Sequence, residues 1–218
     1  SSDLKESYMA LCDVFMKARN DGVKAPHIAF MLAFAPTEGS KQAIEEIYED
    51  LYKPGRYKDL FFMWKGKPLI MAYPDNLSDE IKNYFTFRPG QPTYNSGPSR
   101  DDHWGWLEVY PQHGYAKKST GYEQVTVGVA QNWSAVRGLT AMNAPDVFGR
   151  SYTHHSGLIG GTDAVNHGYN FQEQWERALQ LDPQFIFVTG WNEWIAGSYE
   201  TWGQQYNAFP DQFSQERS

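Results

Sequence analysis

The residues best suited to chemistry lie between two tryptophans near the end of the chain. Residues 189–196 read Thr-Gly-Trp-Asn-Glu-Trp-Ile-Ala, with Glu193 as their carboxylate. A carboxylate can serve as acid, base or nucleophile in glycoside cleavage, and indole rings suit the apolar C–H faces of sugars. Glu193 is therefore the first candidate for a catalytic residue, and the alternative is a glutamate that pairs with an arginine. The neighbouring substrate-binding candidates are Trp191, Asn192 and Trp194.

Two apolar runs are each followed by polar residues that could bind or cleave a sugar. Residues 185–188, Phe-Ile-Phe-Val, predict a buried parallel strand that ends just before Glu193. Residues 125–130 predict another strand, which leads into Gln131 and Asn132. Because the catalytic residues of α/β barrels follow the carboxyl ends of strands, Asn132 joins the substrate-binding candidates.

The segment 89–122 is too long and too aromatic for a plain connector. Its residues 103–113 read His-Trp-Gly-Trp-Leu-Glu-Val-Tyr-Pro-Gln-His. If this stretch is extended, alternate side chains point the same way and form a sugar-contacting face with Glu108 in its middle. The alternative is a surface hairpin whose aromatic side chains pack on another part of the protein. The face would consist of Trp104, Trp106, Glu108, Tyr110 and Gln112, and the substrate-binding candidates here are Trp106, Tyr110 and His113.

A second long segment, 132–169, contains a further carboxylate. Asp146 lies four residues from Arg150, which predicts either an ion pair or a catalytic role. His154 and His155 are adjacent rather than spaced as metal ligands, and the chain has one cysteine. We therefore expect no metal site, and no motif for a cofactor is present.

Composition excludes several classes of protein. With 218 residues, of which 41% are apolar, the chain can bury one sizeable core, so residues 1–218 are expected to form a single domain or part of a larger one. The net charge is −7 and the basic residues are scattered, which argues against a nucleic-acid partner. No apolar run reaches the roughly 18 residues needed to span a membrane.

Strand and helix patterns alternate along the chain, which is typical of an α/β fold. The predicted helices are 3–21, 40–53, 78–83 and 170–182, and the predicted parallel strands are 27–34, 68–73, 84–88, 125–130 and 185–188. A closed (β/α)8 TIM barrel has eight strands, so these five are expected to be its C-terminal part. A doubly wound open sheet is the alternative, although no Gly-x-Gly-x-x-Gly motif supports it.

The run Trp-Asn-Glu-Trp at 191–194 resembles the signature of the family 99 and family 71 group of glycoside hydrolases and of related bacterial barrel proteins. Similar stretches lie at 67–73, 87–90 and 104–113. The resemblance implies a (β/α)8 barrel that acts on carbohydrate in polysaccharide degradation, with Glu193 at a catalytic position. It also favours a secreted or periplasmic location.

One position departs from that family's pattern. Family 99 members carry a second glutamate three residues after the first, where this chain has Ala196. Glycoside cleavage normally requires two carboxyl groups, about 5–5.5 Å apart for retention or about 6.5–9.5 Å for inversion. The partner of Glu193 is therefore expected to be Glu108, with Asp146 and Glu38 as later choices.

Together these features predict a glycoside hydrolase that uses carboxylate acid/base chemistry on a poly- or oligosaccharide. A non-catalytic carbohydrate-binding barrel protein is the alternative, and a protein-protein interface built from the aromatic loops is a more distant one. A barrel fragment exposes unpaired strand edges and apolar faces, so self-association and weak activity are expected of the isolated chain.

Overall fold

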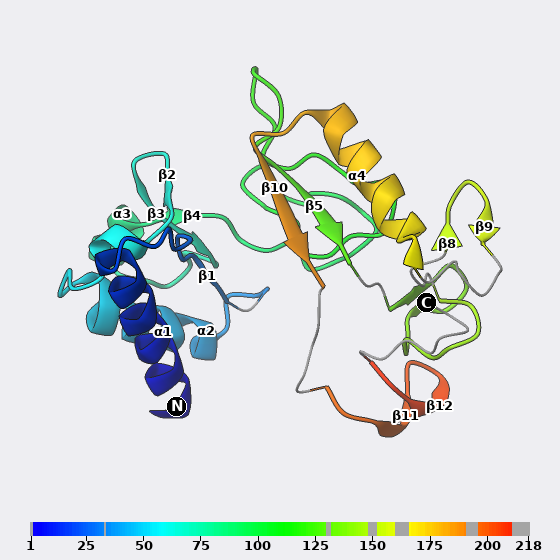
Figure 1. Cartoon of the computed structure of the whole chain (residues 1–218), viewed down its shortest axis with the longest axis horizontal. Helices are drawn as coiled ribbons and strands as arrows, with labels where there is room; N and C mark the ends of the chain where they lie inside the picture. Colours follow the sequence, from blue (N-terminus) through cyan, green and yellow to red (C-terminus); the bar gives the residue numbers. More distant parts are fainter. Residues whose placement is uncertain are drawn as a thin grey trace. The chain divides into compact units, whose positions relative to one another are not determined.

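The computed structural model shows a mixed α/β protein (Figure 1). It describes residues 2–32, 34–129, 132–147, 152–159, 166–190 and 196–210. The α-helices in these ranges are α1 (Ser2–Asn20), α2 (Glu38–Ile47), α3 (Asp79–Tyr84) and α4 (Tyr169–Leu181). The chain divides into two compact units, Ser1–Pro92 and Thr93–Ser218, and each is described by itself.

The first unit is built around the strand β3 (Lys67–Met71). Parallel partners of β3 are β1 (Phe30–Met31) and β4 (Thr86–Phe87), and β2 (Met63–Trp64) pairs with it in the antiparallel direction. A π-helical turn, Tyr48–Tyr52, extends α2, and a 3-10 turn, Lys58–Leu60, precedes β2. The helices α2 and α3 lie between the parallel strands in the sequence, so β1-α2-β3 and β3-α3-β4 are successive βαβ steps.

Aromatic and aliphatic side chains fill the core of this unit. Cys12 of α1, Ile44 of α2 and Ile70 of β3 are fully buried in one cluster. The ring of Tyr52 stacks on Phe61 with centroids 4.0 Å apart. Cys12, the one cysteine of the chain, thus serves as a small core residue.

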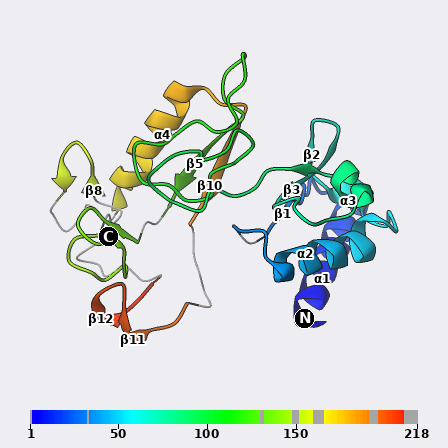
Figure 2. The same cartoon turned by 180° about the vertical axis from the view of Figure 1, so that it is seen from behind.

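The second unit is built around a parallel pair of strands, β5 (Gln124–Gly128) and β10 (Phe185–Thr189). Helix α4 lies against this pair in both views (Figures 1 and 2). Three antiparallel hairpins complete the described part of the unit: β6 (Trp133–Ser134) with β7 (Gly138–Leu139), β8 (Tyr152–Thr153) with β9 (Gly157–Leu158), and β11 (Tyr199–Trp202) with β12 (Gln205–Ala208).

Helix α4 is attached to β5 by apolar packing and by one glutamine. Ala178 packs on Val125 and Val127, and all three are fully buried. Gln174 accepts a hydrogen bond from the backbone N–H of Gly128 at 2.8 Å and donates one to the Gly128 carbonyl at 3.0 Å. Asn170 accepts a third hydrogen bond from Gln174 at 2.8 Å. Gln174 thus satisfies both backbone groups of Gly128, the last residue of β5.

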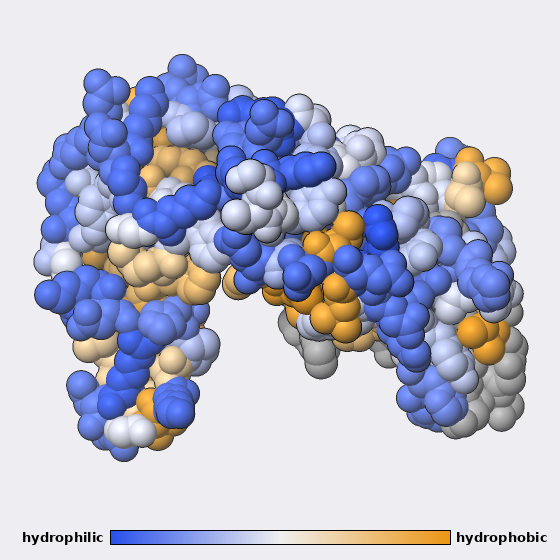
Figure 3. Space-filling model, turned by 90° about the horizontal axis from the view of Figure 1, so that it is seen from above, coloured by the Kyte–Doolittle hydropathy of each residue, from blue (hydrophilic) through white to orange (hydrophobic). Residues whose placement is uncertain are grey.

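All five predicted parallel strands are present, and four of them, β1, β3, β4 and β5, are shorter than their apolar runs suggested. The described residues do not form a closed barrel, and the strands belong to separate small sheets. The expectation that residues 185–188 form a buried strand is wrong, because β10 is partly exposed along its length and Val188 is 43% exposed. Met31 of β1 is exposed as well. Leu179 of α4 is 64% exposed, and Figure 3 shows other apolar residues in orange among the polar surface.

No helix in the described ranges is long and apolar enough to cross a membrane.

Candidate functional site

The ends of β5 and β10 lie at one edge of their sheet. Thr189 is in register with Gly128, and the backbone N–H of Val129 donates to the Thr189 carbonyl at 2.9 Å. The chain segments after the two strands therefore start side by side. Asn132 follows β5 and is partly buried, and its carbonyl accepts a hydrogen bond from the backbone N–H of Thr140 at 2.9 Å. The predicted residues Trp191, Asn192, Glu193 and Trp194 lie outside the described residues.

Glu108 lies at the centre of a buried hydrogen-bonded cluster. Its Oε1 accepts from His113 Nδ1 at 2.7 Å and from the Tyr115 hydroxyl at 2.9 Å. Its Oε2 accepts from the backbone N–H of His113 at 3.0 Å. Glu108 and Tyr115 are fully buried, whereas the His113 side chain is 38% exposed. Glu108 is therefore inside the second unit, and its hydrogen-bond partner His113 is partly exposed to solvent.

A glycine makes room for this cluster. A Cβ at Gly105 would lie 2.7 Å from the Tyr115 ring, closer than real contacts allow. The carbonyl and N–H of Gly105 bind the Gln124 amide at 2.9 Å each. Because Gln124 begins β5, the aromatic segment is fixed to the same strand as α4.

Burial and hydrogen bonding shift the acidities of the cluster. Burial raises the pKa of the Glu108 carboxyl, and the hydrogen bonds from His113 and Tyr115 oppose that effect. The hydrogen bond to Glu108 raises the pKa of His113 above its ordinary value. Burial also raises the pKa of Tyr115, with a smaller contribution from the Glu108 charge. His113 consequently keeps its proton to a higher pH than a free histidine, with Nδ1 held by Glu108.

The aromatic stretch does not form the expected single face. Trp104, Glu108 and Gln112 are buried, whereas Trp106 and Tyr110 are partly exposed, so alternate residues do not share one environment. The Trp104 ring stacks on Phe185 of β10 at 5.4 Å, and its Nε1–H donates to Glu123 at 3.2 Å. The segment folds back on the strand pair because burial of its large aromatic surface outweighs an extended arrangement.

Asp146 forms an ion pair with a different partner from the predicted one. Its carboxylate accepts hydrogen bonds from the Arg137 guanidinium and the Ser134 hydroxyl. The hydrogen bond from Arg137 lowers the pKa of Asp146. The Ser134 hydroxyl also accepts from the backbone N–H groups of Val136 and Arg137, so these contacts hold the β6–β7 turn. Arg150 lies outside the described residues.

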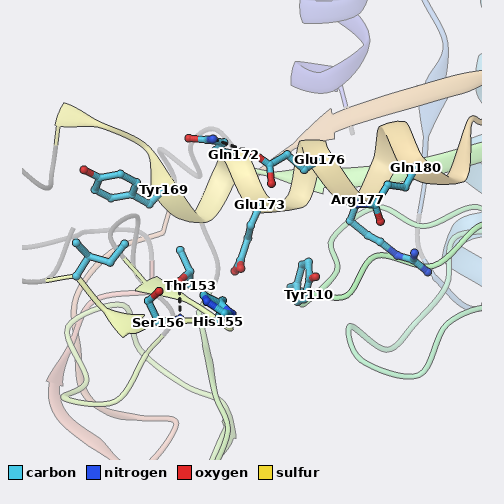
Figure 4. Close-up of a pocket in the computed structure, with 11 residues that line it drawn as sticks. Tyr110, Thr153, His155, Ser156, Tyr169, Gln172, Glu173, Glu176, Arg177 and Gln180 are labelled. Atoms are coloured by element: carbon cyan, nitrogen blue, oxygen red, sulfur yellow. Dashed lines mark hydrogen bonds between the residues drawn. The ribbon is translucent and has the colours of Figure 1, made fainter.

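A groove runs along one face of α4 (Figure 4). Its volume is about 330 Å³. Residues at helical spacing form one wall, and the β8–β9 hairpin together with Tyr110 forms the other. The lining residues are Tyr110, Thr153, His155, Ser156, Ile159, Tyr169, Gln172, Glu173, Glu176, Arg177 and Gln180.

Glu173 joins the two walls of the α4 groove. In Figure 4 it points from the helix toward the hairpin, and its two carboxylate oxygens accept from the backbone N–H of His154 at 3.0 Å each. Asn170 donates to the Tyr152 carbonyl at 2.9 Å. The Tyr110 ring lies 5.0 Å from the His154 ring. The predicted sugar-binding residue Tyr110 is thus part of a defined groove.

Nothing in the sequence pattern marks Glu173, Glu176 or Arg177 as groove residues. Their spacing of three and four is that of one helix face, but a polar helix face usually meets solvent. The hairpin that covers it contributes strands of two residues each, too short to be recognised from a pattern.

Across the described ranges, no group of three or more histidine, cysteine, aspartate or glutamate side chains is arranged to hold a metal ion. Comparison of the chain with protein-family models, with curated proteins and with solved structures found no match.

Proposed function

We propose that the chain is the C-terminal part of a (β/α)8 glycoside hydrolase that acts on a poly- or oligosaccharide. The observation that carries this proposal is the order of the parallel strands. The pairs β1/β3, β3/β4 and β5/β10 are direct parallel neighbours, and each pair has one α-helix between its strands in the sequence. Neighbouring strands in a barrel follow this order throughout, and a doubly wound sheet follows it within each half, away from its switch point.

In this proposal Glu193 acts on the glycosidic bond as acid, base or nucleophile. It follows β10 by four residues in the sequence, and β10 itself ends at the sheet edge where β5 also ends. The flanking tryptophans supply planes for sugar rings. Asn132, which follows β5, and the partly exposed rings of Trp106 and Tyr110 are proposed to orient the substrate.

Glycoside cleavage also requires a second carboxyl group. A raised pKa suits Glu108 to a general-acid role. However, Glu108 is fully buried and hydrogen-bonded to His113 and Tyr115, and of these two partners His113 is the one that is partly exposed. Asp146 is held by Arg137 and Ser134.

Because Glu108 and Asp146 are both held by other residues of the protein, a second candidate function is carbohydrate binding without hydrolysis. The replacement of the family's second glutamate by Ala196 points the same way. In that case the aromatic residues hold a glycan and the chemistry is lost.

One experiment separates the two functions. The full-length protein is incubated with a panel of plant, fungal and bacterial polysaccharides, and the release of reducing ends and the retention of protein on each insoluble glycan are both measured. Release above that of a heat-denatured sample supports the hydrolase. Retention without release supports the binding protein, and the absence of both refutes carbohydrate as the partner.

A further inference from the structure

We propose that the α4 groove is a subsite for one or two units of an uncharged sugar. This inference rests on the proposed carbohydrate function and adds a location and a substrate class to it. All the lining residues belong to the second unit and lie in its described part.

The hydrogen-bonding groups of the groove match a polyhydroxylated ligand. Glu173 and Glu176 accept hydrogen bonds, and Arg177 donates them. Gln172 and Gln180 do both, as do the hydroxyls of the hairpin wall. A sugar hydroxyl is itself donor and acceptor, so a ring with several hydroxyls can satisfy this mixed set. Within the protein, Glu173 accepts from the backbone N–H of His154 and Glu176 accepts from Gln172 at 2.9 Å, while the exposed side chains of Gln172, Glu176 and Gln180 stay accessible to a ligand.

Two tyrosines give the groove flat apolar surfaces. Tyr110 stands on the wall opposite α4, and Tyr169 lies in the first turn of the helix (Figure 4). The Tyr110 ring lies against the imidazole of His154, with 5.0 Å between the centroids. Tyrosine combines such a plane with a polar hydroxyl, which suits the C–H face and the hydroxyl rim of a pyranose.

The charges of the groove select against anionic ligands. Glu173 and Glu176 are one helical turn apart and repel an anionic ligand such as a phosphorylated, sulfated or uronic sugar. Arg177 brings one positive charge to the same lining and does not outweigh the two carboxylates. Neutral sugars therefore meet less repulsion in the groove than anionic sugars do.

Hydrogen bonds hold the two walls of the groove together, and its volume suits a small ligand. Glu173 ties α4 to the hairpin through the backbone N–H of His154, and Asn170 ties it through the carbonyl of Tyr152. The volume of about 330 Å³ is at the lower end of the range of roughly 300–1,000 Å³ for small-molecule sites. A longer glycan would extend from it into solvent.

The test uses cellobiose, mannobiose and N,N′-diacetylchitobiose as neutral probes, and digalacturonate as the anionic control. Binding is measured by calorimetry, and the amide signals of residues 169–180 are followed by NMR. We expect saturable binding of at least one neutral probe, shifts of the α4 signals, and weaker binding of digalacturonate. Preferred binding of digalacturonate, or binding that leaves the α4 signals unmoved, would overturn the inference.

Matched variants locate the site. Tyr110→Ala and Glu176→Gln should each weaken binding at least tenfold. Their controls Tyr206→Ala and Glu200→Gln, exposed and outside the groove, should leave it within twofold. Glu176 is exposed, so its variant keeps the fold even if Tyr110→Ala does not. Equal binding by Glu176→Gln and its control would contradict the proposal.

The outcome is independent of hydrolysis. If the groove binds sugar but the protein cleaves no glycan, the subsite proposal is supported and the glycosidase proposal is refuted. If the protein hydrolyses glycan but no disaccharide binds at α4, the glycosidase proposal is supported and the subsite proposal is refuted.

Discussion

Removal of a single hydroxyl should measure how strongly the buried Glu108 cluster stabilises the second unit. Tyr115→Phe deletes the donor that lies 2.9 Å from Glu108 Oε1 and keeps the fully buried ring. A hydrogen bond to a charged group contributes about 1.5–3 kcal/mol. The carboxylate retains both donors of His113, so the loss stays below the roughly 3–5 kcal/mol for a buried charge whose partner is removed. We therefore expect the free energy of unfolding to fall by about 2 kcal/mol.

The assay is urea unfolding of the full chain at pH 7, followed by tryptophan fluorescence and near-UV circular dichroism. The midpoint should fall while the slope with urea stays unchanged, because the surface exposed on unfolding is the same. Tyr206→Phe is the matched control, since Tyr206 is 67% exposed, and its effect should lie within about 0.5 kcal/mol. A loss of less than about 0.5 kcal/mol for Tyr115→Phe would refute the hydrogen-bonded cluster.

Two further predictions concern the same unit. Because its folded pKa is raised above 6.5 by Glu108, His113 contributes stability that is fully present below pH 6.5 and is lost as pH rises through the folded pKa. The free energy of unfolding should therefore decline above pH 6.5 in the wild type and decline less in His113→Gln; equal slopes in pH-dependent urea titrations would contradict this. Ala178→Leu should overpack the α4–β5 contact and cost about 1–3 kcal/mol, whereas Leu179→Ala, at an exposed position, should change stability by less than about 0.5 kcal/mol. Similar thermal midpoints for these two variants would argue against the packing of α4 on β5.

The elements that could be predicted are those with a strong apolar period. The strand at Val125 and the helix that buries Ala178 follow from such patterns. Neighbouring Leu179 belongs to the same apolar pattern but is exposed, because helical spacing does not fix the edge of an apolar stripe to within one residue.

The Glu108 cluster could not be read from the sequence. Its donors at His113 and Tyr115 are five and seven residues away, which is too far for side-chain contact along one helix and puts them on the opposite face of an extended strand. Tyr115 is brought to Glu108 because its backbone pairs with Gln124 at the start of β5. That contact depends on tertiary folding.

The most direct test of the proposed function is the turnover of Glu193→Gln in the full-length protein. Both proteins are assayed on the polysaccharide that the wild type degrades, with Glu200→Gln as the exposed control. If Glu193 acts on the glycosidic bond, its variant should lose a factor on the order of 10² to 10⁴ in turnover, with glycan retention near that of the wild type. Unchanged turnover in Glu193→Gln would contradict the account.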